Sequence, residues 1–489
     1  MLEQLLPIDL PPGLFNNGTA YQAKGRWHTG NLVRFRNGTR QPVGGWTTRA
    51  LTGAAITGIP TAALSWWADT GNRWLAVGTS RGLFVIDQNN VAYDITHTGG
   101  GHIPGASILA GSFPQLVWHL ELFGDYLVAH AHDYGVSDAR DIVLWQGVAA
   151  TPAVSDFING FGASAPTLPW APAVVTPERF LVWLGAGGPR RRVAWPTQET
   201  TSDWTAASTN SAGDFDLETE GELVCGKKGR GNTLLWTTVD CWTMTYIGGT
   251  LVYQFAKAGD NCGIISDRAS VVLDTGAYWM GFDKFFLYDG FVKSIPCDVH
   301  DYVFGSLNRT YAYKIWALAN PTYDEVTWFY PSSAATEIDR YVTYNYVEQH
   351  WTFGTLTRTT GVTLQAGRST PTPVLFGSDS TMYDHETGTA RTGSTASLES
   401  GPVELGNGDQ VMRIQRIVPD EETQGDVTLS LITSMFPNGA ETTNGPYTAA
   451  NPTSVRLTAR QVRLKVTESA ASAWRLGIPR LGVIPAGRR

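Results

Sequence analysis

The segment that decides the fold reads WWADTGNRWLAVGTSRGLFVID and covers residues 66–87. An aromatic-rich stretch is followed by a polar turn containing Asp and Gly, and a second apolar stretch by another turn containing Gly. Short apolar runs bounded by such turns are typical of consecutive strands, because Gly and Asp supply the backbone conformations that tight turns need. The segment therefore predicts a meander of antiparallel strands.

Related units recur from about residue 55 to residue 390, at spacings of roughly 40 to 60 residues. This spacing is typical of propeller blades with four strands each. We therefore predict a β-propeller-like body of six to eight blades over residues 51–395, with a stacked array of sandwiches as the alternative architecture. The further units cover residues 122–146, 180–195, 233–246, 277–290, 314–330, 340–351 and 373–384.

The composition also indicates an all-β protein. The chain has 489 residues with 53 Gly, 18 Trp, 18 Tyr and 19 Phe, but only 16% of its residues are charged, whereas an average domain has about 25%. Aromatic rings are favoured in strands, and glycines are favoured in the turns between them. The low charge excludes a coiled coil and a disordered scaffold, and the length favours two or three domains.

The regions on either side of the body differ from it in sequence pattern. Residues 1–50 begin with the proline-rich stretch LPIDLPPG (residues 6–13), which predicts an extended N-terminal arm followed by short platform strands. Residues 396–489 contain alternating apolar and polar positions, which predict a C-terminal antiparallel β-sandwich. The net charge is −5 over residues 396–439 and +6 over residues 440–489.

The motifs with a known chemistry are weak in this chain. Residues 78–82 (GTSRG) fit the G-x-S-x-G pattern of hydrolases, but a strand follows them where that motif needs a helix, so a hairpin turn is predicted. Residues 130–133 (HAHD) and 298–301 (DVHD) lack a recognisable third metal ligand. We therefore predict no catalytic residues, no metal site and no cofactor, and we expect that the chain is not an enzyme. Secretory signals and membrane spans are not expected, and isolated thiols are expected at Cys225, Cys241, Cys262 and Cys297.

Charged residues form two unusual groups in the body. The acidic group comprises Asp214, Asp216, Glu218, Glu220 and Glu222. These carboxylates alternate with other residues, so a single strand would project them all from one face, toward solvent, a cation or a channel. A solvated edge that prevents sheet-to-sheet aggregation is the alternative interpretation.

The second group consists of two basic turns, at 190–192 and 227–230. Such turns suit an acidic partner or phosphate, or they are simply solvated.

Four stretches of the chain resemble the tail nozzle proteins of short-tailed bacteriophages, which are also called tail hub or packaged-DNA stabilisation proteins. The first stretch includes NNGT (16–19), KGRW (24–27), NLVRF (31–35) and RQPVGGW (40–46). The others include WMG, YDG and IPCDV within residues 279–299, VTWFYP and DRYV within residues 326–342, and ARQVRL and WRLG within residues 459–477. The resemblance extends over nearly the whole chain and contains no catalytic signature.

The resemblance implies a virion protein that assembles in the host cytoplasm into a six-fold homo-oligomeric ring below the head–tail adaptor of the tail. Such a ring retains packaged double-stranded DNA, conducts it during genome ejection, and docks tail fibres or spikes on its flank. Six copies with a net charge of −8 each carry −48, and an acidic channel would let DNA pass without being held. The acidic group is then the candidate channel lining.

The adaptor-facing platform is expected to consist of the N-terminal arm and the basic last 50 residues. The candidate residues for docking partners are Arg190, Arg191, Arg192, Lys227, Lys228, Arg230, Arg460, Arg463 and Arg475. Neither sequence-specific DNA binding nor membrane insertion is expected. The alternative function is a carbohydrate-binding or depolymerising propeller of a tail or cell surface, in which Trp faces stack on sugars.

Overall fold

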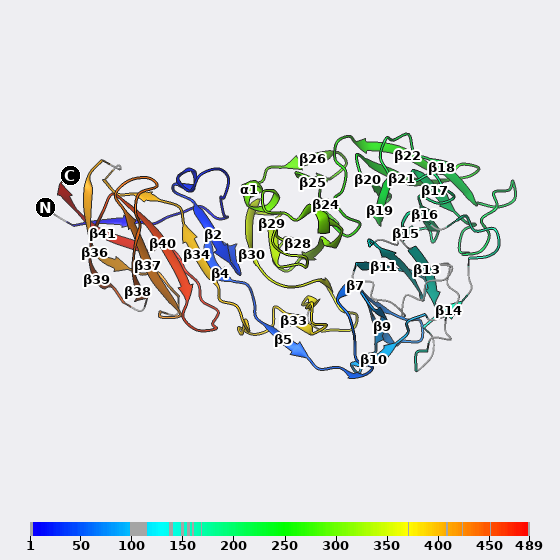
Figure 1. The fold of residues 1–489 in the computed structure, drawn as a ribbon, viewed down its shortest axis with the longest axis horizontal. Coiled ribbons are helices and arrows are strands. Elements are labelled where there is room, and N and C mark those ends of the chain that lie inside the picture. Colours follow the sequence, from blue (N-terminus) through cyan, green and yellow to red (C-terminus); the bar gives the residue numbers. More distant parts are fainter. Residues whose placement is uncertain are drawn as a thin grey trace.

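The structure is a computed structural model that describes residues 3–97, 115–135, 140–147, 151–153, 157–158, 161–167, 169–369, 371–406, 409–422, 424–449 and 451–487. It is nearly all β, which confirms the predicted fold class. Figure 1 shows an elongated molecule with a ring of sheets at one end and a sandwich, which holds both chain ends, at the other.

Within the described residues, seven sheets that each contain a four-stranded antiparallel meander form the ring, so the propeller has seven blades there, within the predicted range of six to eight. Each blade is a meander, and β6 (Thr52–Gly53) adds to the first blade beside β10. The first four blades are β7 (Pro60–Trp67), β8 (Arg73–Thr79), β9 (Gly82–Ile86) and β10 (Val91–Asp94); β11 (Leu116–Phe123), β12 (Tyr126–Asp133), β13 (Arg140–Trp145) and β14 (Phe157–Ile158); β15 (Ala171–Val175), β16 (Leu181–Leu184), β17 (Arg192–Trp195) and β18 (Gly213–Asp216); and β19 (Leu223–Lys228), β20 (Thr233–Thr237), β21 (Cys241–Gly248) and β22 (Val252–Gly259).

The remaining blades close the ring by using a strand from the N-terminal region. Strand β5 (Trp46–Arg49) pairs with β33 as the outer strand of the seventh blade, and the innermost strands of the seventh and first blades lie in contact. The last three blades are β23 (Ser270–Leu273), β24 (Gly276–Met280), β25 (Phe285–Tyr288) and β26 (Val292–Ile295); β27 (Trp316–Asn320), β28 (Glu325–Tyr330), β29 (Arg340–Asn345) and β30 (His350–Thr355); and β31 (Thr360–Val362), β32 (Val374–Phe376), β33 (Met382–His385) and β5.

The recurring tryptophans lie in the core between the blades. Trp145, Trp183, Trp236, Trp279 and Trp328 are almost completely buried, one in each of the second to sixth blades. The indole N–H groups of Trp279 and Trp328 donate to the backbone oxygens of Cys262 and Ala269. Since each blade is too small to bury its own faces, these rings supply the apolar area between neighbouring blades.

The sandwich contains strands from both ends of the chain. One sheet has the order β1-β41-β36-β39 and the other β2-β34-β40-β37-β38, with β35 beside β40. Residues 1–50 are predicted as one region, but the structure distributes their strands over the sandwich, a hairpin (β3–β4) and the seventh blade. These elements are β1 (Gln4–Pro7), β2 (Trp27–Asn31), β3 (Val33–Arg36), β4 (Thr39–Pro42), β34 (Ser397–Ser400), β35 (Val403–Glu404), β36 (Val411–Val418), β37 (Val427–Ser434), β38 (Thr442–Thr448), β39 (Thr453–Ala459), β40 (Gln461–Glu468) and β41 (Arg480–Gly487).

The N-terminal arm is extended, and it packs along the sandwich toward the propeller. Ile8, Leu10 and Leu14 are buried in a hydrophobic core that continues from the sandwich into the fourth to seventh blades. Short helical segments accompany this region: η1 (Ala20–Ala23), α1 (His300–Phe304) and η3 (Arg309–Lys314). None of the helices in the described ranges has the length and apolar character needed to cross a membrane.

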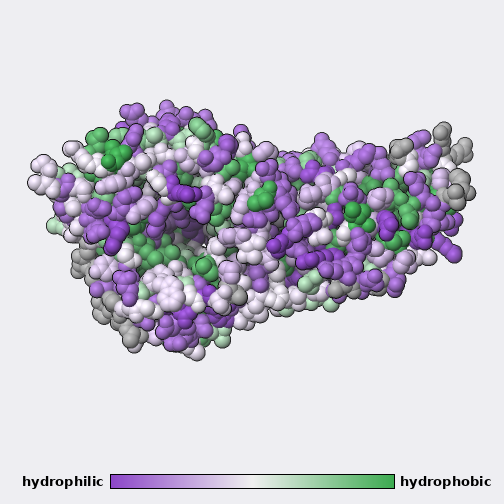
Figure 2. Space-filling view, turned by 180° about the vertical axis from the view of Figure 1, so that it is seen from behind, coloured by the Kyte–Doolittle hydropathy of each residue, from purple (hydrophilic) through white to green (hydrophobic). Residues whose placement is uncertain are grey.

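Polar residues predominate on one face of the molecule (Figure 2). Figure 2 shows hydrophilic residues over most of the face seen from behind, with hydrophobic residues in separate patches. Ser80 and Arg81 form the turn between β8 and β9, so the predicted hairpin at the G-x-S-x-G pattern is confirmed. All four cysteines are free thiols.

Candidate functional site

The N-terminal segment from Leu14 to Trp46 lies between the two units, and we call the region where it contacts both the junction. On the propeller side, the backbone N–H of Leu14 donates to the oxygen of Trp351 at 2.8 Å, and that of Asn16 to the oxygen of Asp298 at 2.7 Å. On the sandwich side, Arg40 and Leu476 exchange two backbone hydrogen bonds of 3.1 and 2.9 Å. The segment therefore fixes the propeller to the sandwich.

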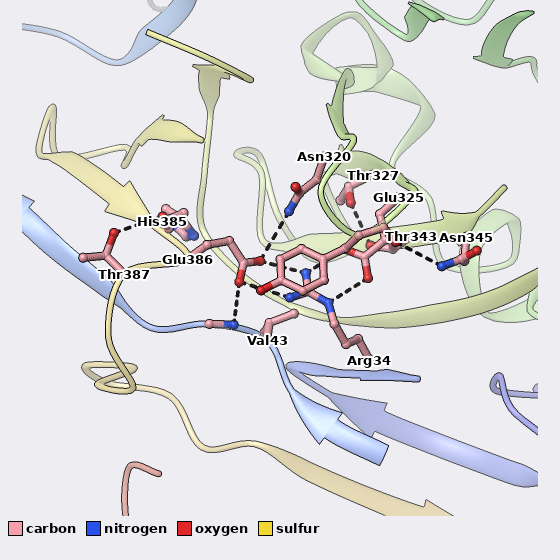
Figure 3. Close-up of polar contacts among 12 residues, drawn as sticks. Arg34, Val43, Asn320, Glu325, Thr327, Thr343, Asn345, His385, Glu386 and Thr387 are labelled. Carbon is pink, nitrogen blue, oxygen red and sulfur yellow. Dashed lines mark hydrogen bonds and ion pairs between the residues drawn. The ribbon is translucent and has the colours of Figure 1, made fainter. Parts of the chain in front are cut away.

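A buried ion cluster is the electrostatic centre of the junction (Figure 3). Arg34 of β3 is only 3% exposed, and its guanidinium donates to both oxygens of Glu325 at 2.9 and 2.7 Å. It also donates to both oxygens of Glu386 at 3.0 and 2.7 Å. The guanidinium stacks 3.5 Å from the ring centroid of Tyr323. One side chain from the hairpin thus binds the sixth blade and the segment that follows the seventh.

The cluster has two carboxylates and one guanidinium, and further groups donate hydrogen bonds to one of the carboxylates, that of Glu386. The backbone N–H of Gly44 donates to Glu386 at 2.9 Å, and the Asn320 amide donates to it at 3.4 Å. Burial opposes the charge of the Arg34 guanidinium, but the two carboxylates outweigh burial and raise its pKa, so Arg34 stays charged. A small cavity of about 70 Å³ lies beside these residues.

Further contacts bring the four segments that resemble tail nozzle proteins together at the junction. The Asn17 amide donates to the backbone oxygen of Cys297 at 2.8 Å, and the backbone N–H of Leu32 donates to the Tyr341 hydroxyl at 2.9 Å. With the pairing between Arg40 and Leu476, residues from all four segments meet in one region. They are far apart in the sequence, and only the fold makes them neighbours.

The structure places the acidic group differently from the prediction. Strand β18 ends at Asp216, and the next strand begins at Leu223, so the five carboxylates do not share one strand face. The pairing with the neighbouring strand continues only to Leu217, whose backbone N–H donates to the oxygen of Arg191 at 3.1 Å. The chain then turns, since the N–H of Thr219 donates to the oxygen of Leu217 and the N–H of Gly221 to the Thr219 hydroxyl, both at 3.0 Å. Glu218 and Glu220 are exposed in the bend that follows.

The first basic turn neutralises part of the acidic group. Arg192 lies 2.7 Å from the Asp216 carboxylate and 3.5 Å from that of Asp214, and its hydrogen bond lowers the pKa of Asp216. Arg190 lies 2.8 Å from the Glu222 carboxylate. The first basic turn and part of the acidic group therefore form one set of ion pairs at the third blade. Asp214, Glu218 and Glu220 are the most exposed carboxylates of the acidic group.

The other predicted docking residues are dispersed. Lys227 and Lys228 belong to β19, the innermost strand of the fourth blade, rather than to a turn, because Leu223 and Cys225 bury the alternate positions of this strand. Lys228 lies 3.3 Å from Glu121, and Arg230 is exposed after the strand. In the sandwich, Arg463 contacts Glu399 and Glu441, Arg475 lies 3.5 Å from Glu422, and the Arg460 guanidinium lies 5.5 Å from the Phe436 ring. Arg488 and Arg489 lie outside the described residues.

No group of three His, Cys, Asp or Glu side chains that could hold a metal ion exists among the described residues. In the two short His- and Asp-containing runs at 130–133 and 298–301, His130 is buried in β12, and His300 contacts Asp301 at 3.2 Å. The sequence did not single out the charged pair of Asp267, which is buried, and Arg268, which lie 3.6 Å apart. Arg268 also donates to the backbone oxygens of Tyr313 and Lys314 at 3.2 and 3.3 Å.

The buried histidines of the propeller predict a loss of stability in acid. Burial lowers the pKa of His130 from 6.5 to about 3, and the charges of His132 and Arg140 act in the same direction. Below pH 6.5 the unfolded chain binds a proton that the folded chain excludes, so the unfolding free energy falls by about 1.4 kcal/mol per pH unit for this residue. This contribution is complete above pH 6.5 and is lost as the pH falls toward 3.

Urea denaturation at pH 7.5 and 5.0 measures this effect. We expect the acid-induced loss to be about 2 kcal/mol smaller in His130→Asn than in the unchanged chain. An equal loss in both proteins would show that His130 does not cause it.

No known protein family matches the sequence, and no curated protein matches it. Among solved structures, an exo-β-1,3-galactanase from Phanerochaete chrysosporium matches at 10% identity and a TM-score of 0.31, over 90% of this chain and 100% of that one. A virginiamycin B lyase from Staphylococcus aureus matches at 8% identity and a TM-score of 0.37, over 70% of this chain and 99% of that one. The Pan2 WD40 domain from Neurospora crassa matches at 7% identity and a TM-score of 0.37, over 73% of this chain and 98% of that one.

These matches correct one expectation from the sequence. Two of the three structures are enzymes, so the expectation that this chain is not an enzyme, which rests on the lack of a catalytic motif, is wrong as it was stated. Catalysis is not excluded by this all-β arrangement of sheets.

Proposed function

We propose that the chain is a subunit of the tail nozzle of a short-tailed bacteriophage. In this proposal six copies form a ring below the head–tail adaptor, retain packaged double-stranded DNA and conduct it during ejection. The ring belongs to the virion tail, assembles in the host cytoplasm and carries tail fibres or spikes on its flank.

One observation carries the proposal: the segments that resemble tail nozzle proteins are neighbours in space. Residues as distant in sequence as Arg40 and Leu476 pair at the junction, and Arg26 lies 2.8 Å from Asp298 there. If the resemblance were due to chance, the four segments would not be expected to lie in one region of the fold. A junction with a continuous core and a buried ion cluster also suits a ring subunit, since its two units must keep one orientation for the ring to close.

The acidic group remains the proposed channel lining, in a narrower form. Asp216 and Glu222 form hydrogen-bonded pairs with arginines, Asp214 is exposed although Arg192 lies 3.5 Å from it, and Glu218 and Glu220 are exposed. Exposed carboxylates repel phosphate, which would keep DNA from being held by the wall of the channel. For the adaptor-facing platform, Arg475 is the most suitable of the C-terminal residues, because its side chain is 56% exposed.

Multi-angle light scattering on the purified chain tests the proposed assembly. We expect a particle of six times the chain mass of 53.1 kDa. A monomer at all concentrations tested would argue against a self-assembling nozzle.

A further inference from the structure

A cleft of about 670 Å³ opens between the seventh blade and the linker to the sandwich. Its walls are Trp46, Thr47 and Thr48 of β5, the segment 355–358 after the sixth blade, and residues of the segment 390–394. Clefts of this volume accommodate small organic ligands. None of the predicted site residues lines this cleft.

Hydroxyl groups dominate the polar lining of the cleft. Thr47, Thr48, Thr355, Thr357 and Thr392 are exposed, and Ser394 and Tyr383 add two further hydroxyls. A hydroxyl group both donates and accepts hydrogen bonds, and it therefore suits a ligand that itself carries hydroxyl groups.

Arg358 supplies the one positive charge of the lining, and it is only 4% exposed. Its Nε donates to Nε2 of His385 at 2.9 Å, and its Nη1 to the backbone oxygen of Thr357 at 3.0 Å. Its guanidinium stacks 3.8 Å from the Tyr383 ring centroid. Among the described residues, Nη2 has no hydrogen-bond partner, and no carboxylate lies within 4.0 Å of the guanidinium.

This lack of a counter-ion distinguishes Arg358 from its neighbours. Arg49 and Arg368 both contact Asp384, and Arg391 lies 2.6 Å from Glu468. Burial lowers the pKa of Arg358 to about 10, so the group is still charged at neutral pH. The charge of Asp379 acts on the pKa in the opposite direction to burial, but it forms no ion pair with Arg358. A buried guanidinium with a free N–H group and no ion pair is costly, and an anionic ligand would relieve that cost.

The chemistry of the lining favours a single carboxylate over phosphate. Phosphate sites gather several cations or backbone N–H groups, whereas this cleft has one guanidinium. The carboxylate of Asp339 also lines the cleft, where it accepts from the N–H and hydroxyl of Ser332 at 2.7 and 2.6 Å, and it would repel a multiply charged anion.

We propose that this cleft binds an acidic saccharide, whose carboxylate pairs with Nη2 of Arg358 and whose hydroxyls bond to the threonine side chains. Carbohydrate binding is the alternative function expected from the sequence, and here it has a defined site. The site does not depend on the proposed role in a phage tail, and binding alone is proposed.

Isothermal titration calorimetry of the full chain tests the site, with trigalacturonate, the neutral trisaccharide maltotriose and inorganic phosphate as probes. We expect saturable binding of trigalacturonate, at least tenfold weaker binding of maltotriose, and at least tenfold loss of trigalacturonate affinity in Arg358→Gln. Arg81→Gln, at an exposed turn of the first blade, is the matched control and should bind like the unchanged chain.

A second variant keeps the test decisive if Arg358→Gln fails to fold. Thr48 is exposed on the outer strand β5 and pairs with Tyr383, so its side chain lies on the face of the strand that borders the cleft. We expect Thr48→Trp to fill the cleft and to abolish trigalacturonate binding. Equal affinity for maltotriose and trigalacturonate, binding of phosphate alone, undiminished binding by Thr48→Trp, or no saturable binding would each overturn the proposal.

Discussion

Replacing Arg34 by alanine is expected to lower the free energy of unfolding by about 3–5 kcal/mol. The change leaves the buried carboxylate of Glu325 and the carboxylate of Glu386, whose side chain is 12% exposed, at 2.7–3.0 Å from the position of a missing cation. Removing one partner of a buried ion cluster costs far more than the net value of the pair, because the remaining charges lose their counter-ion in a low-dielectric environment. Chemical denaturation followed by tryptophan fluorescence measures the loss.

Arg36 provides a matched control on the same strand. It is exposed, although its guanidinium also lies near Tyr323, at 5.1 Å from the ring centroid. We expect Arg36→Ala to change the free energy of unfolding by no more than about 0.5 kcal/mol. Equal effects of the two substitutions would contradict the role of the buried cluster in holding the junction.

Deleting residues 1–49 is expected to prevent cooperative folding of the propeller. The deletion removes β5, which pairs with β33 as the outer strand of the seventh blade, and it removes the Trp46 ring that stacks 5.2 Å from His385. An open seventh blade exposes a strand edge and apolar surface beside the first blade, and both favour aggregation. Near-ultraviolet circular dichroism and size-exclusion chromatography of the truncated chain measure the effect.

Deleting residues 1–7 is the control for this truncation. It removes only β1, which pairs with β41 at the edge of one sandwich sheet. We expect the propeller to keep its near-ultraviolet spectrum in this shorter truncation. Loss of the spectrum in both truncations, or in neither, would contradict a specific role of β5 in closing the ring.

The blades could be predicted because their signals are local. The residues that form the hairpin of β8 and β9 lie within the quoted segment 66–87, where the apolar runs and the turn residues are visible together. The blade count was less accessible, because residues 314–330 and 340–351 are two recurrences in sequence but belong to one sheet. The contribution of β5 to the seventh blade has no local signal, since its partner β33 lies more than 330 residues later.

The candidate site was mostly beyond prediction for a related reason. Arg34 lies in a stretch that carries the resemblance, but nothing in the sequence links it to Glu325, 291 residues away. The acidic group is a case in which a local pattern predicts the wrong structure, because its alternating residues do not form one continuous strand. The chain turns directly after Leu217, where the N–H of Thr219 donates to the oxygen of Leu217 at 3.0 Å, and nothing in the alternating pattern indicates this turn. Alternating apolar and polar residues form one continuous strand only where the backbone stays paired, in register, with a neighbouring strand.

Cryo-electron microscopy of the purified chain tests the central claim most directly. The proposed function predicts six-fold rings in which each subunit contributes one propeller and one sandwich, with Asp214, Glu218 and Glu220 facing the central channel. Single particles without a ring, or rings that place these carboxylates on the outer surface, would contradict it.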